Sequence, residues 1–150
     1  MTTPTRPFAG TRPPPIESLG KQYFTPLMAV PVTTRQPQPA PNKETVNEYL
    51  RLQSGGGAQR DDGILWDIAL ILHSYAPNDQ EAQAEDTLGI ALGWGGNAQG
   101  TFITLKSGVK WWVTYSRANQ LTVKKGDPYV DLVRYQGTVT WRVHGQPLVS

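Results

Sequence analysis

The sequence predicts an α+β fold: a mainly antiparallel sheet of four to five strands, with one long and one short helix packed on one of its faces. Three observations support this prediction. Apolar and polar residues alternate with period two in the last third of the chain, and a near-continuous apolar run occupies 64–72. Apolar residues three and four apart mark a single helix at 78–92. Strand pairs around one helix are typical of α+β domains.

Prolines dominate the N-terminal part of the chain, where ten of the thirteen lie within the first 41 residues. Proline fixes φ and removes a backbone donor, so residues 1–15 are predicted to form an extended arm that is either disordered or ordered only against a partner. Residues 36–41 are a polyproline-like spacer for the same reason. Everything after the arm, residues 16–150, is predicted to be one α+β domain.

Two short elements are expected between the arm and the spacer. Residues 16–28 permit a short helix, which Gly20 and Pro26 limit to a turn or two. Residues 30–34 are rich in β-branched side chains and favour a short strand, which Pro31 confines to the edge of a sheet.

A hairpin is predicted next. Residues 46–53 alternate with period two, and the run 64–72 is short and rich in branched side chains, which is typical of a central buried strand. Residues 54–63 contain three consecutive glycines and are expected to be a flexible turn. The two strands should therefore pair in the antiparallel sense.

The long helix has a start and a stop signal. Asn78 is positioned as a cap and Glu81 follows three residues later, which is the spacing of a capping box. The glycine-rich segment 93–96 is expected to end the helix. The residues expected to face the sheet are Ala84, Leu88, Ala91 and Leu92.

Two more strands are predicted in the last third of the chain, separated by a loop at 124–128. Residues 109–116 alternate, and residues 133–143 give the clearest alternation in the sequence. The apolar set of the last strand, expected to be packed, is Val133, Tyr135, Val139, Trp141 and Val143. Its polar set, expected to face water, is Arg134, Gln136, Thr138, Thr140, Arg142 and His144.

The formal net charge of +2 hides a segregated distribution. Residues 1–60 carry seven bases against three acids, residues 61–104 carry seven acids and no base, and residues 105–150 carry seven bases against two acids. The long acidic block argues against a surface coated with positive charge for nucleic acid. It favours contact between copies of one subunit, or else it is the solvated face of a helix.

No catalytic motif is present: the sequence has no Walker-type phosphate loop, no GxGxxG after a strand, no GxSxG and no HExxH. Cysteine is absent, which excludes thiol catalysis and Cys-based zinc sites. His73 and His144 form no local ligand pair and are expected to be capping or surface residues. We therefore expect no enzymatic activity, no cofactor and no metal.

The sequence also gives expectations for location and for the five tryptophans. It has no apolar run near the ~18 residues that span a bilayer and no secretory signal, so a cytoplasmic protein without membrane contact is expected. Trp66, Trp111 and Trp141 lie among apolar neighbours and are expected in the core. Trp94 follows the helix and Trp112 falls on the face opposite Trp111, so both are candidates for a protein interface.

The order and spacing of several segments resemble the tail terminator proteins of long-tailed phages, most of all those of actinobacterial phages. The N-terminal arm is longer and more proline-rich than that family requires. The segments, which together span about residues 23–148, are VPVTTRQP at 30–37, EYLRLQSGGG at 48–57, LHSYAP at 72–77, NDQEA at 78–82 and VRYQGTVTWRV at 133–143.

The resemblance implies a ring of subunits, commonly a hexamer, at the neck of the virion. In that family the ring is assembled in the host cytoplasm, caps the tail tube, stops its elongation and joins it to the connector or stopper protein on the head side. Genomic DNA passes through without sequence-specific binding, and no catalysis, cofactor or metal belongs to the role. The alternatives are another neck protein, or a small nucleic-acid-binding module that uses Arg134, Arg142 and Trp112 on its sheet face.

Two sets of residues are expected to make contacts. The glycine-rich segment should order against a ring above or below, and the acidic block should face the lumen or the next subunit, because a DNA passage should not hold phosphates tightly. Candidates for subunit or ring-stacking contacts are Gly55, Gly56, Gly57, Arg60, Asp61, Asp62, Trp94 and Trp112. Candidates for the acidic lumen or intersubunit face are Asp79, Glu81, Glu85 and Asp86.

Overall fold

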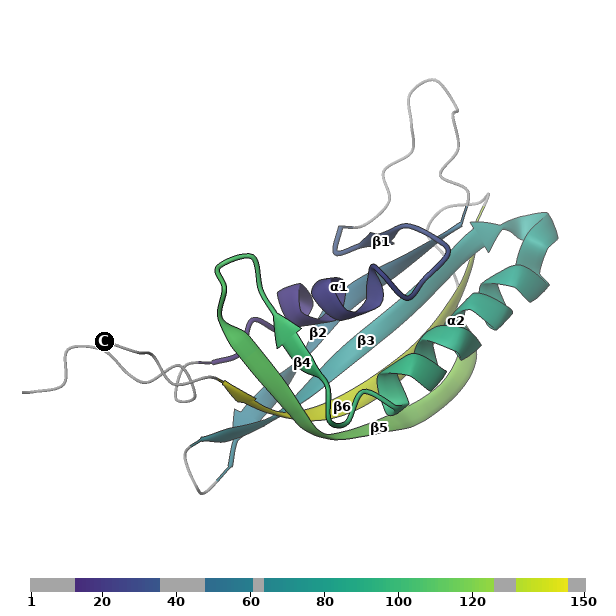
Figure 1. Ribbon diagram of the computed structural model, residues 1–150. Helices are drawn as coiled ribbons and strands as arrows, with labels where there is room; N and C mark the ends of the chain where they lie inside the picture. The colour runs from purple at the N-terminus through teal and green to yellow at the C-terminus, as the bar shows by residue number, and fades with distance from the viewer. Residues whose placement is uncertain (1–12, 36–47, 61–63, 126–131, 146–150) are drawn as a thin grey trace, which may run out of the picture.

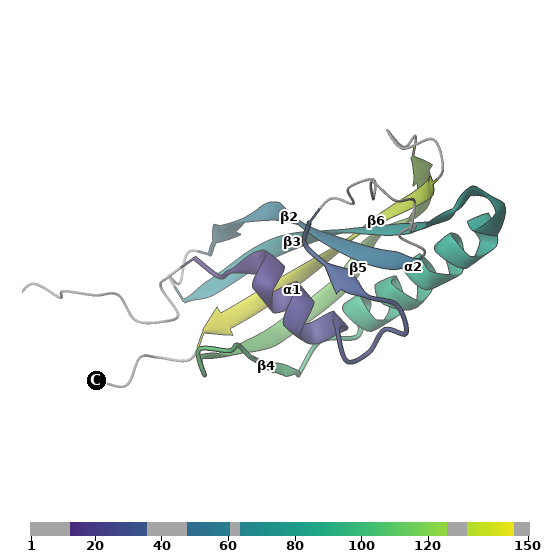
Figure 2. The same cartoon turned by 90° about the horizontal axis from the view of Figure 1, so that it is seen from above.

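The computed structural model describes residues 13–35, 48–60, 64–125 and 132–145. Within these residues the chain forms two helices and six strands, and both helices lie on the same face of a curled sheet (Figures 1 and 2). The elements are α1 (Ile16–Phe24), β1 (Val32–Thr33), β2 (Tyr49–Gln59), β3 (Leu65–Pro77), a 3-10 turn (Asn78–Gln80), α2 (Glu81–Gly96), β4 (Phe102–Thr104), β5 (Lys110–Lys125) and β6 (Leu132–Gly145).

The strands follow the order β1-β2-β3-β6-β5-β4 across the sheet. β1 runs parallel to β2, whereas the other neighbouring pairs are antiparallel. The expected sheet of four to five antiparallel strands is thus corrected to a mixed sheet of six. The strand that sequence reasoning missed is β4, whose three residues are too few for an alternating pattern to be recognised.

The hairpin of β2 and β3 reaches further than expected. Paired strand continues through the glycines to Gln59, so the prediction of a flexible turn over 54–63 is wrong for its first six residues. One extra residue lies between Ser54 and Gly57, a β-bulge at which Gly56 adopts a φ of 85°. A Cβ on Gly57 would lie 2.7 Å from the Asp67 carbonyl oxygen, so glycine permits the close approach of the two strands.

The long helix begins later than its sequence signals indicated. A 3-10 turn occupies Asn78–Gln80, and Gln80 is the N-cap of α2 without a side-chain capping hydrogen bond. The predicted capping box is therefore wrong, because Glu81 is the first helical residue rather than the third after a cap. The predicted end at the glycine segment and the predicted sheet-facing residues are confirmed, since Ala84, Leu88, Ala91 and Leu92 are buried.

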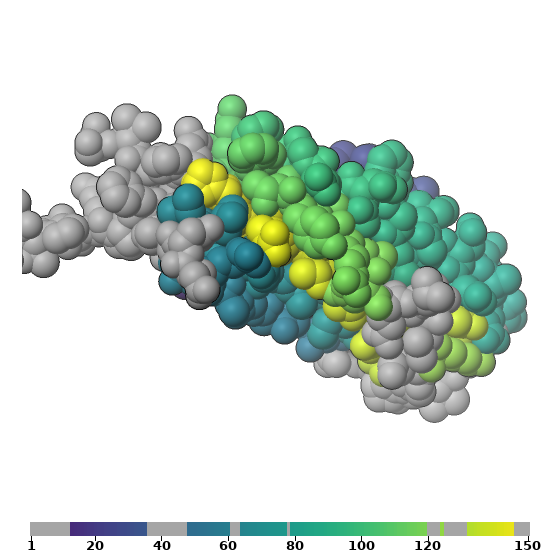
Figure 3. All heavy atoms as spheres, turned by 90° about the horizontal axis from the view of Figure 1, so that it is seen from below, coloured from purple at the N-terminus to yellow at the C-terminus, as the bar shows by residue number. Residues whose placement is uncertain are grey.

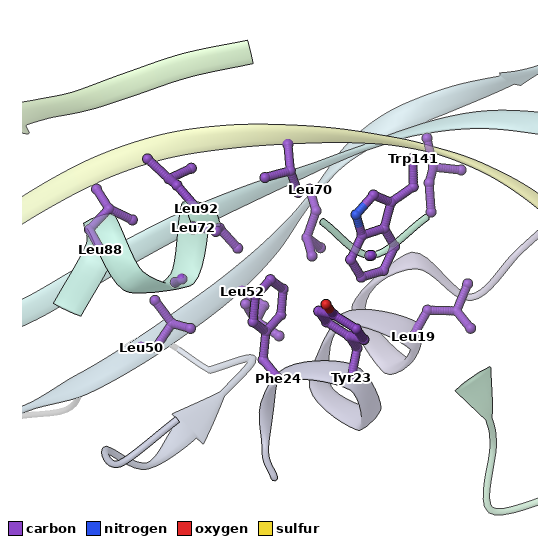
Figure 4. Close-up of a cluster of buried hydrophobic side chains, with 14 of the residues drawn as sticks. Leu19, Tyr23, Phe24, Leu50, Leu52, Leu70, Leu72, Leu88, Leu92 and Trp141 are labelled. Atoms are coloured by element: carbon purple, nitrogen blue, oxygen red, sulfur yellow. The ribbon is translucent and has the colours of Figure 1, made fainter. Parts of the chain in front are cut away.

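The core lies between the two helices and the concave face of the sheet (Figure 4). Tyr23 and Phe24 of α1 pack on Trp141 of β6, with ring centroids 5.2 Å and 6.1 Å from the indole. The Trp141 Nε1–H donates to the Gly95 carbonyl oxygen at 2.8 Å, which joins the last turn of α2 to the sheet. The predicted packed set of β6 is confirmed: Val133, Tyr135, Val139, Trp141 and Val143 are all buried.

The shorter elements also agree with their sequence signals. The helix expected within 16–28 is α1, and the strand expected within 30–34 is β1, at the edge of the sheet. The loop expected at 124–128 starts later, because β5 continues to Lys125. Most of the predicted arm and all of the predicted spacer, 1–12 and 36–41, lie outside the described residues.

Candidate interaction surfaces

The same alternation that fills the core places the other half of the strand side chains on the face away from the helices, here called the outer face. Figure 3 looks onto this face, where β6 runs between β3 and β5. The polar set of β6 is half-buried there, between neighbouring strands, as Arg134, Gln136, Thr138, Thr140, Arg142 and His144.

Three aromatic side chains form a patch on the outer face, here called the aromatic patch: Phe102, Trp112 and Tyr115. Trp112 pairs with Phe102 across β4 and β5, and their rings stack with centroids 5.6 Å apart and an interplanar angle of 15°. All three are exposed, Phe102 by 63%. Trp111, one residue away, is buried on the other face, as the alternation predicted.

An ion-pair chain borders this patch. Asp67 of β3 accepts hydrogen bonds from Arg142 Nε at 2.9 Å and from Arg60 Nη1 at 3.0 Å. The Arg142 guanidinium also lies over the Tyr115 ring, 5.4 Å from its centroid. One carboxylate thus serves two guanidinium groups, so the border of the patch keeps a positive charge.

A second cluster on the outer face was not anticipated. His73 of β3 is 3% exposed, so the expectation of a surface or capping histidine is wrong. Its Nε2 lies 2.9 Å from Gln53 Oε1, and its ring is beside Tyr75, which stacks on Tyr49. Burial lowers the pKa of His73 to about 4, helped by two arginines of the neighbouring strands, Arg51 and Arg134.

The solvent-facing side of α2 carries the second candidate surface. Ala82, Asp86, Ile90 and Trp94 follow one another at spacings of four and are all exposed, here called the helix row. Ile90 is 48% and Trp94 45% exposed. The Tyr23 hydroxyl of α1 donates to the Trp94 carbonyl oxygen at 2.6 Å, which fixes the end of the row.

The predicted acidic face is divided. Asp79, Glu85 and Asp86 are exposed, with no basic residue in the acidic block around them. Glu81 instead bonds within its own chain, because its Oε1 accepts from the Tyr135 hydroxyl at 2.6 Å and lies 2.9 Å from Lys124 Nζ. The bond with Tyr135 and the charge of Lys124 lower the pKa of Glu81, and Glu81 raises the pKa of Tyr135 to about 12.

The remaining predicted contact residues lie at the far end of the hairpin. Gly55, Gly56 and Gly57 are in the exposed extension of β2, and Arg60 follows it. Asp61 and Asp62 lie outside the described residues. The ion pair with Asp67 holds Arg60 at the outer face, where Trp112 also lies. Trp94 is on α2, on the opposite side of the sheet.

Sequence reasoning missed Phe102, Tyr115 and the His73 cluster. Phe102 belongs to the unrecognised strand β4, and Tyr115 follows a register shift in β5 that moves it onto the outer face beside Arg142. For the His73 cluster, the one signal in the sequence was the pairing of the predicted strands, because the correct register places Arg51 and Arg134 near His73.

Comparisons with known proteins give no family for this chain: neither a protein-family model nor a curated protein matches it. Among the described residues, no three His, Asp or Glu side chains lie close enough together to hold a metal ion. No helix in the described part of the chain is long and apolar enough to cross a membrane.

Proposed function

We propose that this protein is a structural tail terminator: copies of it form a ring that caps a phage tail tube, stops its elongation and joins it to the connector on the head side. The proposal includes a ring of about six subunits, after the family resemblance, and a place in the virion at the tail–neck junction. The tube protein meets one face of the ring and the connector protein meets the other. The proposed function involves no catalytic activity.

The observation that carries the proposal is the separation of unlike charges onto opposite sides of one small domain. Exposed acids lie on the solvent side of α2, and arginines border the aromatic patch on the outer face of the sheet. Two such surfaces on opposite sides allow identical copies to bind head to side. The charge separation does not say which ring is formed; the resemblance of the sequence segments, in their order and spacing, suggests a tail terminator ring.

The hairpin extension is the proposed contact with the tube or the connector. Its glycines are exposed and lie beyond the two residues of β2 that pair with β1, so this part of the hairpin is accessible to a partner. Removing Gly55–Gly57 should leave ring formation intact and reduce joining of tails to heads. Normal joining by the shortened protein would exclude this role for the hairpin.

Electron microscopy of the purified protein, alone and mixed with tail tubes, tests the proposed function. We expect rings in native mass spectrometry, and tubes that stop growing and carry one ring at an end. Binding of the ring to connector alone, with no effect on tube length, would favour the other neck proteins.

A nucleic-acid-binding module is the second candidate, because Arg134, Arg142 and Trp112 share the outer face. Arg142 is held by Asp67 and by the Tyr115 ring, which reduces its availability to a phosphate. For DNA binding through n phosphates, log K would fall with log salt with a slope of about −0.9n. We expect no retention of duplex DNA at physiological salt; retention with a steep slope would favour the module.

A further inference from the structure

Five of the six large hydrophobic side chains that are exposed among the described residues belong to two surfaces. Phe102, Trp112 and Tyr115 form the aromatic patch, and Ile90 and Trp94 belong to the helix row. Isolated exposed apolar side chains are ordinary, but clusters that are rimmed by charge mark interaction sites. Both surfaces are therefore candidate sites for binding another protein surface.

The aromatic patch is a partly fixed surface. Stacking keeps the rings of Phe102 and Trp112 nearly parallel. The Arg142 guanidinium lies over the Tyr115 ring, and Asp67 holds that guanidinium in place. Aromatic side chains that are already ordered lose little conformational freedom when a partner covers them. Such residues are enriched in the centres of protein interfaces.

Two glycines lie along one side of the helix row. Gly89 and Gly93 of α2 lie beside it, and a Cβ built on either would meet nothing within 4 Å. Glycine in a helix is unfavourable relative to alanine, and packing within the chain does not require it at these two positions. Without side chains at these two positions, Ile90 and Trp94 stand higher than the surface beside them and are accessible to a partner.

The charges around the two surfaces are opposite. Glu85 and Asp86 accompany the helix row, in a block without bases. Lys110 and Arg117 accompany the aromatic patch as exposed residues of β5, and Arg60 and Arg142 border it. The two surfaces thus match each other in apolar character and in sign of charge.

These surfaces cannot meet within one chain. α2 packs on the concave face of the sheet (Figure 2), with its buried residues toward the sheet and the helix row on its exposed side. The strand register places the aromatic patch on the outer face. Their match is therefore available only between copies. A contact between two different surfaces of identical chains is heterologous, and it closes into a ring when the rotation between copies allows.

We propose that the helix row of one copy, centred on Ile90 and Trp94, docks on the aromatic patch of the next copy, centred on Phe102 and Trp112. Asp86 lies at the rim against Arg117 of the neighbour. This proposal rests on the proposed ring function and names the surfaces that build the ring.

The test uses two variants of the full chain, Trp94→Ala and Trp112→Ala, each of which removes one surface. Both side chains are exposed, so each variant should keep the wild-type circular dichroism spectrum. We expect the concentration for half-assembly in sedimentation velocity to rise at least tenfold for each. Ile64→Ala is the matched control, since Ile64 is 47% exposed and belongs to neither surface; its assembly should be unchanged.

Mixing the two variants gives a result that no general destabilisation produces. Trp94→Ala keeps an intact aromatic patch and Trp112→Ala keeps an intact helix row, so one good contact forms between them and propagation stops. We expect a 1:1 heterodimer in native mass spectrometry. In a second series, Asp86→Arg and Arg117→Asp should each weaken assembly, and the double variant should recover most of it.

The outcomes separate this interface from the proposed function. If wild type assembles and both tryptophan variants assemble at the same concentrations, or their mixture yields no heterodimer, the interface is wrong and the ring function stands. If wild type remains monomeric at all concentrations, with and without tail tubes, the ring function fails and this interface fails with it.

Discussion

His73 lies on the outer face of the sheet, yet water hardly reaches it. Protonating the ring would put a charge in a buried position beside Arg51 and Arg134, which explains why its pKa falls to about 4. The folded protein thus holds a neutral imidazole in a pH range where the unfolded chain, with a pKa near 6.5, binds a proton.

Stability should therefore depend on pH through His73. The folded pKa lies below the unfolded one, so this contribution is fully present above about pH 6.5 and is lost as the pH falls toward 4. The loss is at most about 3 kcal/mol. Urea unfolding at pH 7.5 and pH 4.5 measures it, with His73→Gln as the control that keeps a polar partner for Gln53. An equal loss in both proteins would contradict the assignment.

Glu81 differs from Asp79 and Asp86 because it accepts a hydrogen bond from Tyr135 and pairs with Lys124. In Glu81→Gln the negative charge that raises the pKa of Tyr135 to about 12 is absent, so that pKa should fall back toward 10. Ultraviolet titration of the tyrosines, with Tyr135→Phe to identify the signal, measures the change. A titration curve identical to wild type would show that Glu81 does not control Tyr135.

At the scale of elements, α2 carries glycines with opposite roles. Gly95 faces the core, where an added Cβ would lie 2.8 Å from Val139 Cγ1 and 3.2 Å from Phe24 Cζ. Gly89 faces open space. The same substitution in one helix should therefore have effects of opposite sign.

We expect Gly95→Ala to destabilise the domain by about 1–3 kcal/mol through overpacking. Gly89→Ala should stabilise it by about 0.5–1 kcal/mol through helix propensity. Urea unfolding at concentrations below assembly measures both without a contribution from contacts between copies. Two changes of the same sign would mean that α2 does not pack as described.

The elements that sequence predicted well are those whose pattern is local. The alternation of β6 and the spacing of Ala84, Leu88 and Leu92 give their faces directly. The glycines of β2 were taken for a turn because their pairing depends on Ile68 of another strand, which no local pattern shows. The parallel pairing of β1 and the stacking of Phe102 on Trp112 depend on register across the sheet in the same way.

For the whole molecule, the arrangement of charge matters more than its net value of +2. In the proposed ring, the acids on the solvent side of α2 would attract the bases around the aromatic patch of the next copy before the apolar surfaces touch. Salt screens such attraction over about 8–10 Å at 0.1–0.15 M ionic strength, whereas it leaves apolar contact intact. The rate of assembly should therefore depend on salt more strongly than the stability of the finished ring.

Neutralising the three exposed acids, with Asp79→Asn, Glu85→Gln and Asp86→Asn combined, tests this. We expect slower assembly and a weaker dependence of its rate on salt, because the electrostatic part of the encounter is removed. Stopped-flow light scattering between about 0.05 and 0.5 M NaCl measures the rate, where screening lengths shorten several-fold. Gln22→Lys, at an exposed position of α1 that belongs to neither surface, changes the net charge in the same direction and controls for that change. Equal salt slopes in the triple variant and wild type would mean that α2 does not meet its neighbour through its acids, and would leave those carboxylates free to line the passage for DNA.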